Sequence, residues 1–270
     1  MTPWLESVGV VGLAGLGVLA GERLSRRPRG IWAGGYVLAF SPILLIALLK
    51  RVPALGLVGP LSWLVAGRSE FVVTAPLAAM VLSLLAPRLA RRRDRAAVRA
   101  AIVGFTLFCA LPFALPPLMA ASLASLQTNV DADGVCRQSR GYNCGPAAAV
   151  TALRRLGLDA SEGELAVLAG TTPVSGTQAD TLCEVLGRRY AREGLRCRYR
   201  SFDSLADLRD AGVVITVINF SLLVDHYVTV LEVGDVEIRL GDPLEGSKVM
   251  RREEFERVWR RVGIVVRRGG

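Results

Sequence analysis

The sequence contains a single histidine, His226, among its 270 residues, and its five cysteines are scattered along the chain. This composition excludes the usual zinc sites, which need several histidines or cysteines at short, regular spacings. The sequence also has no Gly-x-x-x-x-Gly-Lys-Ser/Thr stretch, so we expect no phosphate-binding loop and no ATPase activity. No metal and no cofactor are therefore predicted.

Acidic residues are scarce in the first 125 residues, which hold 4 of them against 13 lysines and arginines, whereas the rest of the chain holds 20 of each sign. The net charge of +9 therefore belongs entirely to the first part (13 − 4 = 9). A nucleic-acid-binding domain would carry excess positive charge on its folded surface, so no nucleic-acid partner is predicted. We expect a membrane domain over residues 1–125 and a neutral globular domain over residues 126–270.

Four apolar runs in the first part are long enough, or nearly long enough, to cross a bilayer. They cover about residues 4–21, 31–49, 70–87 and 100–122. Each run taken alone could be a buried core helix, but four runs with almost no interior charge favour membrane spans. The lipid bilayer is therefore a predicted partner of this multi-pass chain.

Arginines cluster in two of the loops between these runs, over residues 23–29 and 88–99. Cytoplasmic loops carry an excess of basic residues, which predicts that both loops lie in the cytoplasm and that the globular domain lies outside the cytoplasmic membrane. The apolar segment 55–66 is only about a dozen residues long, which suits an interfacial or re-entrant piece. If it crossed the bilayer, the two arginine-rich loops would lie on opposite sides, and we expect four spans.

The second part changes from helical to strand periodicity along its length, which predicts an α+β domain with an antiparallel sheet. Helices are expected over residues 144–156, 161–168, 177–189, 204–210 and 251–259, and strands over 213–220, 227–233, 236–240 and 262–266. Ser161 and Glu164 form a capping-box pattern at the start of the second helix. Gly234-Asp235 predicts a hairpin turn.

Cys144 begins the first of these helices and is followed directly by Gly145 and Pro146. Proline is tolerated in the first helical turn, and the partial positive charge of a helix N-terminus favours a thiolate over a thiol. A small buried cysteine at a helix start is also common, so the choice between a structural and a reactive residue depends on its partners.

His226 is the only imidazole that could hold a thiol proton near neutral pH, and it stands at the mouth of a predicted strand. Asp242, which precedes Pro243 at the far end of the next strand, is the candidate acceptor that would orient the ring. A two-residue hairpin turn would place Asp242 on the opposite face of the sheet. We therefore predict an odd-numbered loop or a bulge that puts Asp242 directly across from His226. In isolation, a lone histidine and an acid before a proline are more often structural.

These residues together resemble a known family. Gln138, Asn143-Cys144-Gly145-Pro146-Ala147, His226-Tyr227 and Asp242-Pro243 are similar to the pattern of the bacteriocin-processing, double-glycine leader peptidases, papain-like cysteine peptidase domains usually fused to ABC exporters. The similarity covers about residues 130–266. It departs from the family at Asn143, where an Asp is usual, and in the lack of a following ATPase.

The resemblance implies a papain-like fold in which Cys144 is the nucleophile and His226 is the general base and acid. Asp242 would orient the imidazole, and the Gln138 side chain would stabilise the oxyanion together with the Cys144 backbone N–H. It also implies a peptide or protein substrate, and it makes a separate exporter a candidate partner.

The predicted function is a membrane-anchored thiol endopeptidase on the outer side of the membrane, with a Gly-Gly-type sequence as the candidate cleavage site. One alternative is a cell-wall amidase or a transglutaminase-like acyl-transfer enzyme. Another is a non-catalytic, leader-binding accessory membrane protein, which the presence of both Cys144 and His226 disfavours. A location outside the cytoplasm would allow one disulfide, for which Cys183 and Cys197 are the expected pair.

Overall fold

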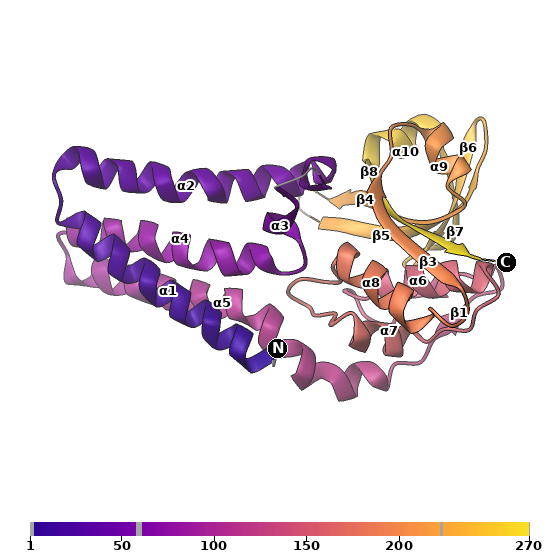
Figure 1. The fold of residues 1–270 in the computed structure, drawn as a ribbon, viewed down its shortest axis with the longest axis horizontal. Helices are drawn as coiled ribbons and strands as arrows, with labels where there is room; N and C mark the ends of the chain where they lie inside the picture. The colour runs from indigo at the N-terminus through magenta and orange to yellow at the C-terminus, as the bar shows by residue number, and fades with distance from the viewer. Residues whose placement is uncertain (1–2, 58–60, 222–223, 270) are drawn as a thin grey trace. The chain divides into compact units, whose positions relative to one another are not determined.

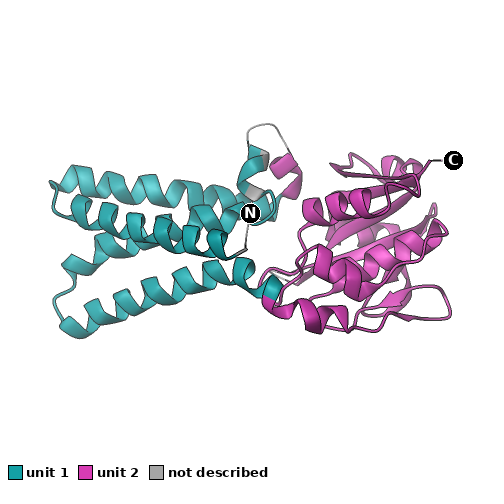
Figure 2. Cartoon of the chain, turned by 60° about the horizontal axis from the view of Figure 1, so that its bottom comes forward, with its two compact units in different colours: residues 1–52, 59–117 teal, residues 53–58, 118–270 magenta. Residues whose placement is uncertain are grey.

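The computed structural model describes residues 3–57, 61–221 and 224–269. The chain forms two compact units, one made of residues 1–52 and 59–117 and the other of residues 53–58 and 118–270 (Figure 2). The boundary expected between residues 125 and 126 falls just after helix α5 (Arg92–Ala124), whose last turns belong to the second unit.

The first unit is built from long helices that run side by side (Figure 1). These are α1 (Pro3–Ser25), α2 (Arg29–Arg51), α4 (Ser69–Leu85), which continues into η3 (Ala86–Arg88), and most of α5. Among the described residues, four helical stretches are long and apolar enough to cross a membrane. They are Trp4–Ser25, Arg29–Arg51, Ser69–Arg88 and Arg92–Ala124.

The segment 55–66 is not a continuous helix in its described part. It contains the end of η1 (Pro53–Leu57) and the four-residue helix α3 (Ser62–Val65), while residues 58–60 lie outside the described residues. A helix of four residues is far too short to cross a bilayer, which is consistent with the expected interfacial or re-entrant segment.

Helices α1 and α4 approach each other closely because α1 presents glycines at the contact. A Cβ atom on Gly17 would lie 2.1 Å from the carbonyl oxygen of Pro76, and one on Gly21 would lie 2.5 Å from that of Met80. Gly17 and Gly21 are one helical turn apart, so the missing side chains let the two backbones meet. Buried Val10 and Ala14 of α1 extend the same apolar cluster.

Among its described residues, the second unit combines the end of α5 and five further α-helices with an antiparallel sheet, which confirms the predicted α+β class. The helices are α6 (Cys144–Arg155), α7 (Glu162–Leu168), α8 (Ala179–Arg189), α9 (Leu205–Asp210) and α10 (Arg252–Val258). The main sheet has six strands in the order β3-β8-β4-β5-β6-β7. Their bounds are β3 (Leu195–Ser201), β4 (Val213–Ser221), β5 (Val224–Val233), β6 (Glu237–Asp242), β7 (Gly246–Arg251) and β8 (Trp259–Arg268). A separate pair joins β1 (Asn129–Val130) to β2 (Cys136–Arg137).

The two edge strands of the sheet, β3 and β7, were not predicted from the sequence. In β3 arginines alternate with Leu195, Cys197 and Tyr199, so only one face of the strand is apolar. Strand β7 begins at Gly246, whose φ of +91° favours glycine, and it contributes only Met250 to a core. Edge strands are paired on one side only and need less apolar surface than central strands, so their sequence signal is weaker.

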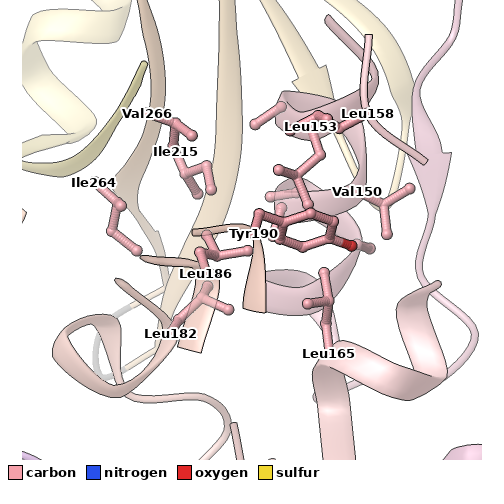
Figure 3. Close-up of a cluster of buried hydrophobic side chains, with 14 of the residues drawn as sticks. Val150, Leu153, Leu158, Leu165, Leu182, Leu186, Tyr190, Ile215, Ile264 and Val266 are labelled. Atoms are coloured by element: carbon pink, nitrogen blue, oxygen red, sulfur yellow. The ribbon is translucent and has the colours of Figure 1, made fainter. Parts of the chain in front are cut away.

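Two hydrophobic cores lie on the two faces of the sheet, since neighbouring residues of one strand belong to different cores. Ile215 of β4 packs with α6, α7 and α8, and Figure 3 shows this core around Tyr190 and Leu186. Val214, the residue before it, packs with α9 and α10. Helix α6 is buried along most of its length, from Gly145 to Leu153. The residue at its N-terminus is therefore held on a rigid support.

The hairpin of β5 and β6 contains the predicted irregularity but has a different register. A bulge lies between Val230 and Glu232, and Thr229 pairs with Gly241. Continuing that pairing by one residue places Asp242 across from Val228, not across from His226 as predicted. The predicted direct pairing is wrong by two residues. Because side chains alternate with a period of two, Asp242 and His226 still share one face of the sheet.

Candidate active site

Cys144 is the first residue of α6, the position predicted from Gly145 and Pro146, and it is partly exposed. The Thr229 hydroxyl of β5 donates to the Ala148 carbonyl at 2.7 Å, which fastens the first turns of α6 to the sheet. The thiol is therefore placed at a helix N-terminus, where backbone N–H groups lack helical partners.

His226 and Asp242 form a buried pair beside this thiol. The Nε2 atom of His226 lies 2.8 Å from Oδ1 of Asp242, and the two residues are 4% and 3% exposed. The same Asp242 oxygen accepts the backbone N–H of Leu244 at 2.8 Å. The backbone turn that follows Asp242 thus holds its carboxylate in place, and the carboxylate orients the imidazole ring.

The charges of this pair are set by the hydrogen bonds around it. Burial lowers the pKa of His226, but hydrogen bonds to Asp242 and Cys144 outweigh it and raise that pKa from 6.5 to about 9. Burial raises the pKa of Asp242, but the bonds from His226 and from the Leu244 N–H lower it below its usual value. The imidazole contacts both the thiol and the carboxylate, so the structure brings Cys144, His226 and Asp242 together.

Gln138 lies next to the turn that carries Asp242. Its backbone N–H donates to the Pro243 carbonyl at 3.0 Å, and its side-chain Nε2 donates to the Arg140 carbonyl at 2.9 Å. Its Oε1 atom is buried and has no hydrogen-bond partner among the described residues. One of the two amide hydrogens is therefore used inside the loop, which leaves the other for a bound group.

Several residues around the site were not singled out from the sequence. The ring of Phe220 is 56% exposed and its centroid lies 5.6 Å from that of His226. The carboxylate of Glu162 accepts hydrogen bonds from the loop 138–144. In the sequence, Glu162 is only one of the two residues between Ser161 and Glu164 of the capping box, so nothing marks it as a neighbour of that loop.

Thr177 packs directly against the start of α6. A Cβ atom on Gly145 would lie 2.9 Å from the Cβ of Thr177, and the Tyr227 hydroxyl donates to the Thr177 carbonyl at 3.1 Å. Glycine after Cys144 is therefore required by this close approach. Tyr227 follows His226 directly, so the same contact also holds the histidine strand.

The expected disulfide is absent, because all five cysteines are free thiols. Cys183 of α8 and Cys197 of β3 are nevertheless neighbours, and a hydrogen bond between the two side chains lowers the pKa of Cys183. Burial raises the pKa of the Cys136 thiol to about 12. Among the described residues, no group of three or more His, Cys, Asp or Glu side chains is arranged to hold a metal ion.

The α+β architecture, with a cysteine at the start of a central helix and a buried His–Asp pair on the sheet, is that of a papain-like cysteine peptidase domain. Residues 133–269 match the family model described as "Peptidase C39 family". The chain belongs to the peptidase C39 family, which confirms the resemblance drawn from the motifs.

Relatives and solved structures cover the same half of the chain. An uncharacterized protein of Methanothermobacter marburgensis is 35% identical over 134 residues, which is 50% of this chain and 88% of the relative. One from Methanothermobacter thermautotrophicus is 32% identical over 143 residues, 53% of this chain and 94% of the relative. The peptidase domain of Streptococcus ComA, a bifunctional ABC transporter involved in quorum sensing, is similar with a TM-score of 0.44 and 24% identity, over 49% of this chain and 96% of that domain. A double-glycine-motif protease from an AMS/PCAT transporter, solved with its leader peptide, gives a TM-score of 0.44 and 19% identity, over 53% of this chain and 93% of that protein.

Proposed function

We propose that this chain is a membrane-anchored cysteine endopeptidase in which Cys144 is the nucleophile, His226 the general base and acid, and Asp242 the residue that orients the imidazole. The observation that carries the proposal is the buried hydrogen bond between His226 and Asp242, together with the Cys144 thiol beside the same imidazole, which helps to raise the pKa of His226. Cysteine nucleophiles need a base within hydrogen-bond reach, and that base needs an orienting partner.

In the proposed mechanism the Cys144 sulfur attacks the carbonyl carbon of a peptide bond while His226 holds the thiol proton. The new C–S bond forms as the carbonyl π electrons move onto oxygen. The tetrahedral oxyanion then collapses, the C–N bond breaks, and His226 passes its proton to the leaving amine. Water attacks the resulting thioester with His226 as base, which releases the acid and restores the thiol.

The surrounding groups support each of these roles. Asp242 binds Nε2 of His226, which leaves Nδ1 to exchange the thiol proton. The raised pKa of His226 favours an imidazolium that holds this proton at neutral pH. The remaining amide hydrogen of Gln138 and the backbone N–H of Cys144 would donate to the oxyanion, where hydrogen bonds strengthen as charge develops.

The proposed substrate is a peptide or protein cleaved after a Gly-Gly-type sequence. Membership of the peptidase C39 family supports a peptide substrate. The motif resemblance supports a double-glycine site. The motif resemblance also supports a separate exporter as a candidate partner.

The proposed location of the peptidase unit is the outer side of the cytoplasmic membrane. Support comes from the four helices that can cross a bilayer and from the two arginine-rich loops that join the first to the second and the third to the fourth. The excess of arginine in these loops favours the cytoplasm for both, so the single span that follows the second loop would place the peptidase unit on the other side.

The test uses the full-length protein in detergent micelles with a synthetic peptide that contains one Gly-Gly site. We expect cleavage at that site by the wild type and by the matched control Cys183→Ala, and none by Cys144→Ala. The peptidase proposal is wrong if the wild type leaves the peptide intact but releases fragments from peptidoglycan, which is the amidase result. It is equally wrong if the wild type joins an added amine to a glutamine substrate, which is the transglutaminase result.

A further inference from the structure

Glu162, the first residue of α7, is a fully buried carboxylate. Among the described residues it takes part in no ion pair. A buried charge is strongly unfavourable unless hydrogen bonds compensate for the loss of water. The groups that donate to this carboxylate therefore decide whether it is tolerated.

All three donors come from the loop that joins Gln138 to Cys144. Oε1 of Glu162 accepts the backbone N–H of Ser139 at 2.9 Å and Nδ2 of Asn143 at 3.2 Å. Oε2 accepts the Ser139 hydroxyl at 2.7 Å. Ser139 directly follows Gln138, and Asn143 directly precedes Cys144. One carboxylate thus holds both ends of the loop, beside the proposed oxyanion donor and beside the proposed nucleophile.

We infer that Glu162 is a positioning residue of the catalytic loop, and that Asn143 is an amide because Glu162 is its partner. The inference rests on the proposed roles of Gln138 and Cys144 and adds the residue that sets their separation. An aspartate at position 143 would place a second carboxylate where Nδ2 now lies, 3.2 Å from Oε1 of Glu162. Two carboxylates at this distance cannot both stay ionised. The two carboxylates could be accommodated while they share one proton, and loss of that proton would displace the loop.

Two further groups among the described residues lie beside Glu162. Cys136 of β2 is the titratable side chain beside it, and this thiol stays protonated at neutral pH because its own pKa is raised to about 12. The Thr128 hydroxyl accepts the backbone N–H of Glu162 at 2.9 Å and carries no charge. A pH effect at the loop of an Asn143→Asp protein would therefore arise from the new pair of carboxylates.

The test measures the rate at which iodoacetamide alkylates Cys144 in the full-length protein, followed by mass spectrometry from about pH 6 to about pH 9. This reagent needs no peptide substrate. The proteins compared are the wild type, Asn143→Asp, Glu162→Gln and the double variant. Asn129→Asp is the matched control, since it makes the same chemical change at an exposed position of the same unit.

We expect Asn143→Asp to slow alkylation at least about tenfold at the upper end of this range and less at the lower end, where the pair shares a proton. The double variant Asn143→Asp with Glu162→Gln should restore a rate within about threefold of the wild type throughout, because the aspartate then faces an amide. The control should follow the wild type. Rescue at one position by a change at the other is a result that general loss of packing does not give.

The inference is overturned if Asn143→Asp keeps the wild-type rate and pH profile, or if the double variant reacts no faster than Asn143→Asp. If Asn143→Asp fails to fold, the double variant still tests the coupling between positions 143 and 162. A folded and reactive double variant supports the coupling, and an unfolded one contradicts it. Failure of the wild type to cleave a Gly-Gly peptide would overturn the proposed peptidase function but would leave this alkylation series intact.

Discussion

The stability of the peptidase unit depends on pH through His226 at the alkaline end of the scale and through Asp242 at the acid end. The pKa of His226 is raised in the folded protein from 6.5 to about 9, so its contribution is fully present below about pH 6.5 and is lost as the pH rises through about 9. That difference corresponds to about 3 kcal/mol at most. The pKa of Asp242 is lowered, so its contribution is present above its usual value and is lost in acid.

Asp242→Asn should therefore flatten the alkaline limb of the stability curve. The amide carries no charge to stabilise the imidazolium, so the pKa of His226 falls towards its usual value. We expect the thermal midpoint of the wild type to drop between about pH 6.5 and about pH 9 and that of the variant to drop less. The control is Asp235→Asn, which removes an exposed acid from the turn of the same hairpin. Equal slopes for the wild type and Asp242→Asn would contradict the coupling.

Gln138 provides a test of the oxyanion site that separates binding from chemistry. An oxyanion donor acts mainly on the transition state, so Gln138→Ala should lower kcat by about 100- to 1000-fold while KM changes little. The measurement is steady-state cleavage of the Gly-Gly peptide by the full-length protein. Gln127→Ala, an exposed glutamine of the linker, should keep the wild-type kcat. A raised KM with an unchanged kcat would assign Gln138 to substrate binding.

At the scale of the elements, most helices and strands could be predicted from the sequence, because capping residues and apolar periodicity are local signals. The capping pattern at Ser161 is confirmed by its side chain, which accepts the N–H of Glu164. The helix at Cys144 and the apolar strand at Val213 also lie where their periodicity predicted. What the sequence did not show depends on long-range contacts. The edge strands β3 and β7 and the two-residue register difference of the hairpin are decided by pairing partners distant in the chain.

The same limit applies to the candidate site. Cys144, His226 and Asp242 could be named from their chemistry, because a single histidine leaves one candidate base. Glu162 could not, since a glutamate in the first turn of a helix is favoured by the helix dipole whatever it contacts. Its partners lie 19 and 23 positions away, and only the folded loop brings them together.

Helix packing in the first unit gives a prediction at the same scale. Gly17→Leu should separate α1 from α4, because a Cβ there would lie 2.1 Å from the Pro76 carbonyl oxygen. We expect a clear fall in the thermal midpoint of the detergent-solubilised protein. Gly12→Leu is a matched control on the same helix, where a Cβ would meet nothing within 4 Å, and it should unfold like the wild type. If both variants unfold alike, the close contact of α1 and α4 does not stabilise the unit.

At the scale of the whole molecule, α5 runs from the first unit into the second, to which its residues 118–124 belong. Its C-terminal end meets α7, since a Cβ on Gly163 would lie 2.5 Å from the Leu123 carbonyl oxygen. The linker that follows reaches the same place, where Thr128 accepts the N–H of Glu162. The first turn of α7 thus contacts both the end of the fourth apolar helix and the loop of Cys144. The loop 138–144 and the last residues of α5 are therefore both contacted by the first turn of α7, within the second unit.

The charge distribution makes the orientation of the chain a testable property. Alkaline phosphatase is active only outside the cytoplasm, and green fluorescent protein exported in unfolded form fluoresces only inside. We expect a phosphatase fused after the last residue to be active, and one inserted in the loop 88–99 at its non-helical residues 89–91 to be inactive, with fluorescent fusions giving the reverse. The reason is that the arginines of residues 23–29 and 88–99 oppose translocation, and one span then separates residues 88–99 from the peptidase unit. A fluorescent C-terminal fusion together with an active phosphatase in the loop 88–99 would place the peptidase unit in the cytoplasm. Fluorescence at the C-terminus and also in the loop 88–99 would show that the fourth apolar helix does not cross the membrane.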